Sequence, residues 1–324
     1  MYIVTGGAGF IGSALVWKLN QQGITDILVV DDLGRGGKWK NLVNLRYSEY
    51  LHKATFLQLL EQGKLGPEVQ AILHMGACSS TTETDAEYLM ENNYRYTKIL
   101  AQFCLRHDVR FIYASSAATY GDGVLGFDDD PEMMPRLKPL NMYGYSKQLF
   151  DLWALRNNLT DRMVGLKFFN VFGPNEYHKN DMMSVVCKAY RQILETGRLR
   201  LFKSHRPDYA DGAQQRDFIY VKDCLDVVWW LLENREVNGI FNLGRGEAKS
   251  WNDLARAVFS AMEQPFNVEY IDMPEAIREK YQYYTEASMN RLYDLGCPVI
   301  FGSLETGVAD YIHTYLMKED PYLG

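Results

Sequence analysis

Cysteine is scarce in this sequence and the cysteines that exist are irregularly spaced. The five residues are Cys78, Cys104, Cys187, Cys224 and Cys297, and they include no CxxC pair. This pattern argues against a zinc site and against a disulfide framework, and the six histidines show no metal-ligand spacing either. We therefore expect reduced thiols and no bound metal, as in a protein of the cytoplasm.

Long apolar runs and an excess of basic charge are also missing. No run approaches the ~20 apolar residues of a membrane span, and the opening MYIVTGGAGF lacks the basic and apolar regions of a signal peptide. Lys and Arg number 34 against 41 Asp and Glu, so the net charge is −7. The sequence thus predicts no membrane span and no nucleic-acid partner, because it offers no basic field to gather phosphates.

What the chain does contain is enough hydrophobic sequence for a full core. Its length is 324 residues, and 47% of them are hydrophobic. A chain of this size needs no disulfide or metal to stabilise its fold. A disordered chain and a small secreted scaffold are therefore excluded.

Short β-rich runs alternate with stretches of helical period through the first half of the chain. The predicted strands are 2–5, 27–31, 69–75, 109–115 and 163–169, and the main helices between them are 11–22, 85–106 and 145–158. Repeated alternation of this kind predicts an α/β protein with a Rossmann-type, doubly wound parallel sheet.

The regular alternation of predicted strands and helices ends near residue 172. We predict a helix near 182–196, a long polar surface loop over 203–216, a helix over 221–234 and a strand over 239–244. Accordingly, residues 1–171 are expected to form a dinucleotide-binding domain, with a returning segment near 217–245. Residues 172–324 are expected to form mostly a smaller, interleaved α/β substrate-binding lobe.

A glycine pattern follows the first predicted strand. Gly6, Gly9 and Gly12 form GxxGxxG within TGGAGFIG, which permits a tight turn, a close approach of backbone to pyrophosphate and phosphate binding at a helix N-terminus. The second strand ends in Asp31 and Asp32, roughly 20 residues on, where an acidic residue commonly bonds the adenosine ribose. The pattern predicts a bound dinucleotide.

The residues alone leave NAD and NADP both open. An acidic residue at the end of this strand disfavours a 2′-phosphate. Arg35 and Lys38 in the following loop could pair with one, or could simply be solvated.

A YxxxK pattern predicts proton-transfer chemistry. Tyr143 and Lys147 lie one helical turn apart and share a face. The ammonium is expected to lower the pKa of the tyrosine, and the lysine can also hold a ribose hydroxyl. Ser116 follows a predicted strand at the edge where ligands bind in this architecture, although it could instead cap the local backbone.

Together, the GxxGxxG turn, the strand-end serine and YxxxK resemble the extended short-chain dehydrogenase/reductase family over essentially the whole chain. The family includes nucleotide-sugar epimerases and dehydratases, and the resemblance implies Ser116, Tyr143 and Lys147 as catalytic residues. Family dehydratases carry an Asp-Glu pair beside the serine, whereas this chain has Ala117-Ala118. Dehydration is therefore disfavoured.

Longer strings resemble the branch of this family that inverts carbon 6 of an ADP-linked heptose for lipopolysaccharide precursors. They include MGACSSTTETD (75–85), PLNMYGYSK (139–147) and FFNVFGPNEYHK (168–179). The resemblance implies NADP, transient oxidation of the sugar to a ketone, and a homo-oligomer, a pentamer in this branch. It makes Lys179 the second acid/base group opposite Tyr143, although by sequence alone Lys179 reads as a solvated loop lysine.

The resemblance also implies binding residues along the chain. For the dinucleotide these are Gly6, Gly9, Phe10, Ile11, Gly12, Asp31, Asp32, Lys38, Lys53, Met75, Gly76, Ala77, Cys78, Ser79, Asn92, Lys147, Val171 and Lys179. For the ADP-sugar they are Asn170, Asp181, Lys188, Phe202, Lys203, Ser204, His205, Arg216 and Tyr281.

Three positions depart from the branch pattern. Met75 replaces a glutamate, Asp181 replaces a substrate-contacting serine, and Lys188 replaces a histidine. A carboxylate at position 181 opposes an anionic ADP-sugar unless a lysine offsets it. Two alternatives therefore stay open: an epimerase or reductase for another nucleotide-diphospho-sugar, and a catalytically silent dinucleotide-binding protein.

Overall fold

The computed structural model describes residues 1–65, 68–278 and 281–324. They form a seven-stranded, fully parallel main sheet in the order β10-β6-β5-β4-β1-β2-β3. Its strands are β1 (Tyr2–Thr5), β2 (Ile27–Asp31), β3 (Glu49–His52), β4 (Ala71–His74), β5 (Arg110–Ser116), β6 (Val164–Phe168) and β10 (Gly239–Leu243). The predicted doubly wound α/β sheet is confirmed.

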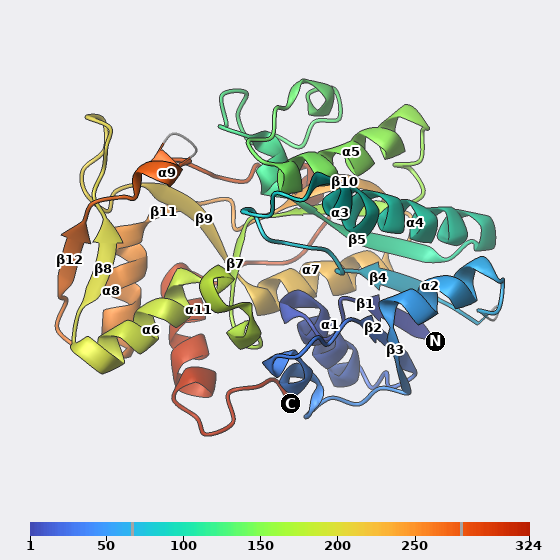
Figure 1. Cartoon of the computed structure of the whole chain (residues 1–324), viewed down its shortest axis with the longest axis horizontal. Helices are drawn as coiled ribbons and strands as arrows, with labels where there is room; N and C mark the ends of the chain where they lie inside the picture. The colour runs from blue at the N-terminus through green and yellow to red at the C-terminus, as the bar shows by residue number, and fades with distance from the viewer. Residues whose placement is uncertain (66–67, 279–280) are drawn as a thin grey trace.

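Helices cover both faces of this sheet because its strands are apolar on both sides (Figure 1). In β1, Val4 packs in the core that includes α1 (Phe10–Gln21) and α7 (Val221–Glu233). The neighbouring Ile3 packs in the core that includes α2 (Lys53–Glu61), α4 (Tyr96–His107) and α5 (Met142–Arg156). Successive strand residues point to opposite faces, so each strand contributes to both cores.

The smaller lobe is built from two short sheets and the helices around them, on the left of Figure 1. One sheet has the order β11-β9-β7 and the other pairs β12 with β8. The strands are β7 (Asn170–Phe172), β8 (Leu199–Phe202), β9 (Gln215–Tyr220), β11 (Ala248–Ser250) and β12 (Val268–Ile271). The other helices are α6 (Val185–Thr196), α8 (Trp251–Ala261), α9 (Glu275–Arg278), α10 (Asn290–Asp294) and α11 (Leu304–Asp310). The short helix α3 (Ala86–Leu89) instead packs on α5, beside the main sheet.

The chain passes between the two parts more than once. After β9 it forms α7, which packs on α1, and then β10, which joins the main sheet beside β6. The polar stretch over 203–216 is a loop as far as Gln214, and its last residues begin β9. The sequence analysis did not predict β3 or α2. Strand β3 gave no clear pattern because it is a four-residue edge strand whose side chains are half-buried or exposed.

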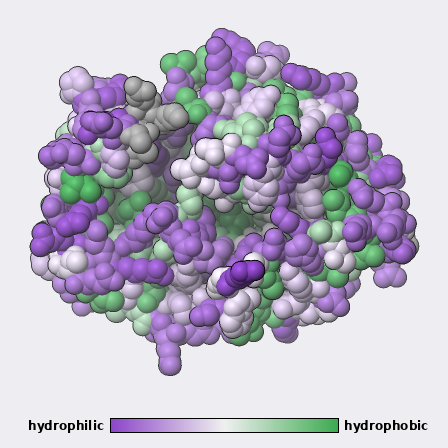
Figure 2. Space-filling model, in the orientation of Figure 1, coloured by the Kyte–Doolittle hydropathy of each residue, from purple (hydrophilic) through white to green (hydrophobic). Residues whose placement is uncertain are grey.

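Polar residues dominate the face shown in Figure 2, and apolar residues appear in a hollow near its centre. In the part of the chain that the structure describes, no helix is both long and apolar enough to cross a membrane.

Candidate active site

A cavity of about 580 Å³ opens at the carboxyl ends of the main-sheet strands. Residues at the ends of β1, β2 and β5 line it, together with the segment that follows β4. The strand order reverses between β1 and β4, and such a switch point is where ligands bind in open α/β sheets. The volume lies in the range of small-molecule and cofactor sites.

The sequence had singled out most of the residues that line this cavity. They include every predicted dinucleotide residue except Val171, and the predicted catalytic residues Tyr143, Lys147 and Lys179. Val171 lies on β7 and packs against the core instead. Lining residues that the prediction did not include are Thr5, Val30, Gly34, Ser80, Tyr88, Tyr96, Ala114, Ser115, Phe168, His178 and Met182.

The glycine turn fits the phosphates of a dinucleotide. Gly6 has φ +65°, and a Cβ there would lie 2.5 Å from the backbone nitrogen of Gly76. A Cβ on Gly12 would lie 2.0 Å from the carbonyl oxygen of Gly6. Helix α1 begins after Gly9 with no side-chain cap, so its first-turn N–H groups are available to an anion at the cavity floor.

Asp31 ties this turn to β2 rather than standing free for a ribose. Its Oδ2 accepts a hydrogen bond from the backbone N–H of Ala8 at 2.8 Å. Its Oδ1 accepts from the backbone N–H of Asp32 at 2.6 Å and from the Lys38 ammonium at 2.5 Å. Because both oxygens already have partners within the chain, Asp31 orders the binding loop.

Asp32 is the more accessible of the two carboxylates, with its side chain 49% exposed. It lies 4.0 Å from the Lys53 ammonium and 3.8 Å from the ring of His52. The Lys53 ammonium also donates to the side-chain oxygen of Asn92 at 3.0 Å. This end of the cavity therefore holds lysines and carboxylates in close proximity.

Helix α5 positions Tyr143 and Lys147. The side chain of Asn141 accepts a hydrogen bond from the backbone N–H of Gly144 at 2.8 Å, which starts the helix and places Tyr143 in its first turn. The side-chain ammonium of Lys147, one turn further, donates to the carbonyl of Ala114 on β5 at 2.9 Å. Both side chains thus reach the cavity from one helix face.

The expected lowering of the tyrosine pKa by Lys147 is not seen in the protein chain alone. Burial raises the pKa of Tyr143, a hydrogen bond with Ser116 lowers it, and the charge of Cys78 raises it. Burial lowers the pKa of Lys147 to about 8, against the raising effects of Asp151 and Cys78. Lys147 bonds a backbone carbonyl, so the group that acts directly on the phenol is Ser116.

Ser116 itself does not line the cavity, although its neighbour Ser115 does. Its hydroxyl oxygen accepts a hydrogen bond from the backbone N–H of Ala118 at 3.1 Å. Ser116 therefore caps the local backbone, as one of the two expectations had it, and also forms a hydrogen bond with Tyr143.

Lys179 lines the cavity from another element, a short 3-10 segment over Tyr177–Met182 that is interrupted at Asn180. Its ammonium lies 5.3 Å from the ring centroid of Phe10 at the start of α1. Burial lowers the pKa of Lys179, the carboxylate of Glu176 raises it, and Lys188 lowers it. The side chain is therefore closer to neutrality than a solvated lysine, as an acid/base group requires.

Part of the predicted ADP-sugar set forms a separate cluster in the smaller lobe. The buried guanidinium of Arg216 lies over the rings of Tyr281 at 5.0 Å and Trp251 at 5.8 Å, and it donates to the carbonyls of Gln215 and Gln282. No carboxylate lies within 4 Å of it in the described residues. A buried cation without an acidic partner suits a diphosphate.

Phe202, Lys203, Ser204 and His205 lie at the end of β8, beside this cluster. The backbone N–H of His205 donates to the hydroxyl of Tyr283 at 2.9 Å, and the rings of Tyr283 and Tyr281 are 5.5 Å apart. The side-chain amide of Gln282 donates to the carbonyl of Gly121, just past the segment of Ser116. The cluster is thus joined to the segment that follows Ser116.

The remaining predicted substrate residues are more exposed. Asn170 is exposed at the start of β7, two positions before the core residue Phe172. Asp181 is exposed, and the ammonium of Lys188 donates to its backbone carbonyl rather than to its carboxylate. The carboxylate of Asp181 is therefore not neutralised by that contact.

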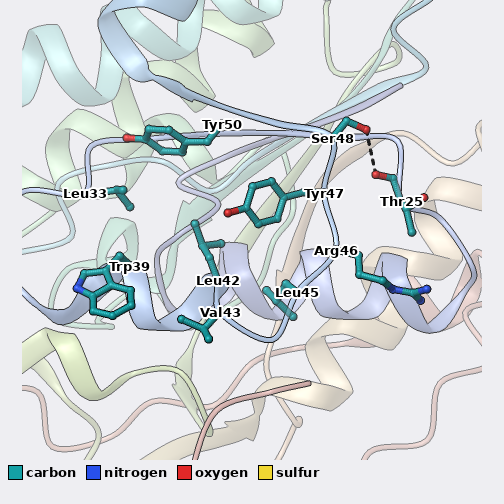
Figure 3. A pocket seen from close by; sticks show the side chains of 10 residues that line it. All are labelled: Thr25, Leu33, Trp39, Leu42, Val43, Leu45, Arg46, Tyr47, Ser48 and Tyr50. Carbon is teal, nitrogen blue, oxygen red and sulfur yellow. Dashed lines mark hydrogen bonds between the residues drawn. The ribbon is translucent and has the colours of Figure 1, made fainter.

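A second hollow, of about 860 Å³, lies between β2, β3 and the segment that joins them. Figure 3 shows Leu33, Tyr47 and Tyr50 along one side of it and Trp39, Leu42 and Val43 along the other. It brings together no set of catalytic groups. Among the described residues no cluster of His, Cys, Asp or Glu could hold a metal ion.

Comparison with known proteins agrees with this geometry. A family model described as "NAD dependent epimerase/dehydratase family" matches residues 2–244. The ADP-L-glycero-D-manno-heptose-6-epimerase of Nitratidesulfovibrio vulgaris (strain DP4) is 63% identical over 100% of both chains, and that of Fusobacterium nucleatum subsp. nucleatum is 49% identical over 100% of both. The Helicobacter pylori ADP-L-glycero-D-manno-heptose-6-epimerase structure superposes with a TM-score of 0.80 at 27% identity, over 96% of this chain and 94% of that one.

Proposed function

Because this chain belongs to the NAD dependent epimerase/dehydratase family, we propose that it inverts carbon 6 of the heptose in ADP-D-glycero-D-manno-heptose to give the L-glycero form. This is a step of lipopolysaccharide precursor synthesis. The observation that supports it most is one cavity lined by the glycine turn and by Tyr143 and Lys179 from separate elements.

Inversion needs acid/base groups on both sides of the reacting carbon, because one residue cannot reach the hydroxyl in both configurations. When bound, the nicotinamide supplies a reversible acceptor for the hydride of carbon 6. Tyr143, held by Ser116, exchanges the hydroxyl proton in one configuration, and Lys179 exchanges it in the other. Lys147 holds the ribose side of the cofactor while bonded to Ala114.

The ADP part of the substrate is assigned to the cluster around Arg216. Its guanidinium suits the diphosphate, and the aromatic rings around Tyr281 offer flat apolar surfaces. Phe202 to His205 border the same cluster.

Incubation of the purified chain with ADP-D-glycero-D-manno-heptose, followed by proton NMR, tests the proposed reaction. We expect a mixture rich in the L-glycero form without added reductant, and no conversion of the matching GDP-heptose.

We further infer that the dinucleotide is NADP. Lys38 and Lys53 both line the cavity beside Asp32, and Asp31 is bonded to groups within the chain. Asp32 favours the second candidate, NAD, because its accessible carboxylate could bond a free 2′-hydroxyl. Titration of both cofactors decides: we expect tighter binding of NADP, and a Lys38→Ala variant that loses affinity for NADP more than for NAD.

We also propose that the chain forms a homo-oligomer and is located in the cytoplasm. The oligomer is inferred from the family resemblance, which points to a pentamer. All five cysteines lie within the described residues and each is free, which agrees with a reducing compartment.

A further inference from the structure

Glu176 is a fully buried carboxylate on the segment between β7 and α6, three residues before Lys179. Its Oε1 accepts hydrogen bonds from the hydroxyl of Ser184 at 2.6 Å and from the backbone N–H of Gly173 at 3.4 Å. Its Oε2 accepts from the backbone N–H of Ser184. Burial of a carboxylate is costly unless such bonds compensate. These bonds join the two ends of the 173–184 segment.

The segment between those ends bends sharply and carries Lys179. Asn175 and Asn180 have φ values of 74° and 48°, in the left-handed region. Within the bend, the backbone N–H of Lys179 donates to the carbonyl of Glu176 at 3.0 Å. The direction in which Lys179 leaves the backbone therefore depends on a turn that Glu176 closes through its side chain and its main chain.

The charge of Glu176 acts on Lys179 as well. Burial and the nearby Lys188 lower the pKa of Lys179, whereas the Glu176 carboxylate raises it. Reciprocally, burial raises the pKa of Glu176, while its bonds to Ser184 and the charge of Lys179 lower it. The other titratable groups around this pair are Tyr177, His178, Cys187 on α6 and Tyr311 near the C-terminal end, and Lys38 acts on His178 from the cavity side.

We propose that Glu176 is a positioning residue for Lys179: its buried carboxylate closes the turn that aims Lys179 into the cavity and keeps a negative charge beside it. The inference rests on the proposed function only for the statement that Lys179 exchanges a proton with the sugar. Without Glu176, burial and Lys188 act unopposed, so the pKa of Lys179 would fall further.

Two variants compare the buried carboxylate with an exposed one. Glu176→Gln removes the negative charge and keeps the size of the side chain. Asp181→Asn makes the same change at an exposed carboxylate two residues from Lys179, so it is the matched control.

The measurement is the rate of acetylation of Lys179 by acetic anhydride in the full chain from pH 6 to 10, followed by mass spectrometry of the Lys179 peptide. Only the neutral amine attacks the anhydride, forming the amide and releasing acetate, so the pH profile reports the pKa of Lys179. We expect Glu176→Gln to shift the profile to lower pH by about one unit. Asp181→Asn should stay within a few tenths of a unit of the wild type.

Two results would overturn the proposal: identical profiles for the wild type and Glu176→Gln, or an equal shift in Asp181→Asn. If Glu176→Gln does not fold, Glu176→Asp takes its place, because it keeps a charge in the same pocket. Its profile should stay near that of the wild type, and a displacement of about one unit would contradict the proposal.

Failure of the proposed function is recognised separately. A wild type that does not interconvert the epimers contradicts the proposed function and leaves the acetylation result standing. An active wild type with unaltered acetylation in Glu176→Gln contradicts only the role of Glu176.

Discussion

Tyr143 is the residue proposed to exchange the proton of the reacting hydroxyl. It lines the cavity, and burial raises its pKa, so in the chain without cofactor it is a protonated phenol at neutral pH. A cationic nicotinamide and the Lys147 ammonium nearby would favour the phenolate once the cofactor is bound. We therefore expect the proposed proton transfer to occur in the complex with the cofactor.

We predict that Tyr143→Phe lowers the turnover of ADP-heptose by about 10²–10⁴-fold, because the general acid/base group is lost. Binding of the dinucleotide should persist, since the cavity keeps its shape. Tyr145→Phe is the matched control, because Tyr145 is 47% exposed on the same helix and does not line the cavity. Steady-state rates and a cofactor titration check both variants; unchanged turnover in Tyr143→Phe would refute the assignment.

At the residue scale, sequence reasoning found what local spacing reveals. Gly9 lies three positions after Gly6, and Lys147 lies four positions after Tyr143. Such short spacings are visible in the sequence, so the chemistry of both pairs can be inferred from the pattern. Glu176 and Asp151 were missed because a carboxylate in a sequence looks like a solvated charge. Their partners come from other elements, and no local pattern shows that both are buried.

At the scale of elements, the strand-turn-helix unit of β1 and α1 sets the approach of the cofactor. Gly9 has φ −73°, which alanine tolerates, but a Cβ there would lie 3.0 Å from the carbonyl oxygen of Gly6 and within 4 Å of Lys38. Gly9→Ala is therefore predicted to fold and to lose at least about tenfold in dinucleotide affinity. Gly37→Ala, with nothing within 4 Å of its added Cβ, should bind normally. Equal affinities for the two variants would contradict the proposed phosphate site.

A buried ion pair holds α5 against the main sheet. The Lys167 ammonium on β6 lies 2.8 Å from the Asp151 carboxylate on α5, and both side chains are almost fully buried. Tyr113 and Ser115 on β5 donate to the same carboxylate at 2.9 and 2.6 Å. The network therefore fixes the catalytic helix relative to two strands.

Asp151→Asn leaves the buried Lys167 without its charge partner, so we predict a loss of about 3–5 kcal/mol in the free energy of unfolding. Asp226→Asn breaks the Lys18–Asp226 pair, whose carboxylate is 51% exposed, and should cost less than about 1 kcal/mol. Urea unfolding of the two variants measures the difference. Similar losses would show that the buried network does not stabilise the fold.

At the scale of the whole molecule, the doubly wound parallel sheet could be predicted because apolar runs, glycine turns and helical periods alternate along the chain. The smaller lobe could not, because β7, β11 and β12 are only three or four residues long and pair with distant segments. The second hollow, at Trp39 and Tyr50, carried no sequence signal either.

Assembly also belongs to this scale. The chain has a mass of 37.3 kDa, and the proposed pentamer predicts a particle of about five times that mass in light scattering after size exclusion. A mass equal to that of one chain at micromolar protein concentrations would contradict the proposed oligomer. It would leave the proposed chemistry of the site unaffected.

The most direct test of hydride transfer at carbon 6 uses ADP-D-glycero-D-manno-heptose with deuterium at that carbon, incubated with the protein in ordinary water. A hydride that is removed and returned within one cavity predicts an L-glycero product that keeps the deuterium at carbon 6 through many turnovers. Loss of the label to water would mean that a proton, not a hydride, leaves that carbon. That result would contradict transient oxidation at the cavity of Tyr143 and Lys179.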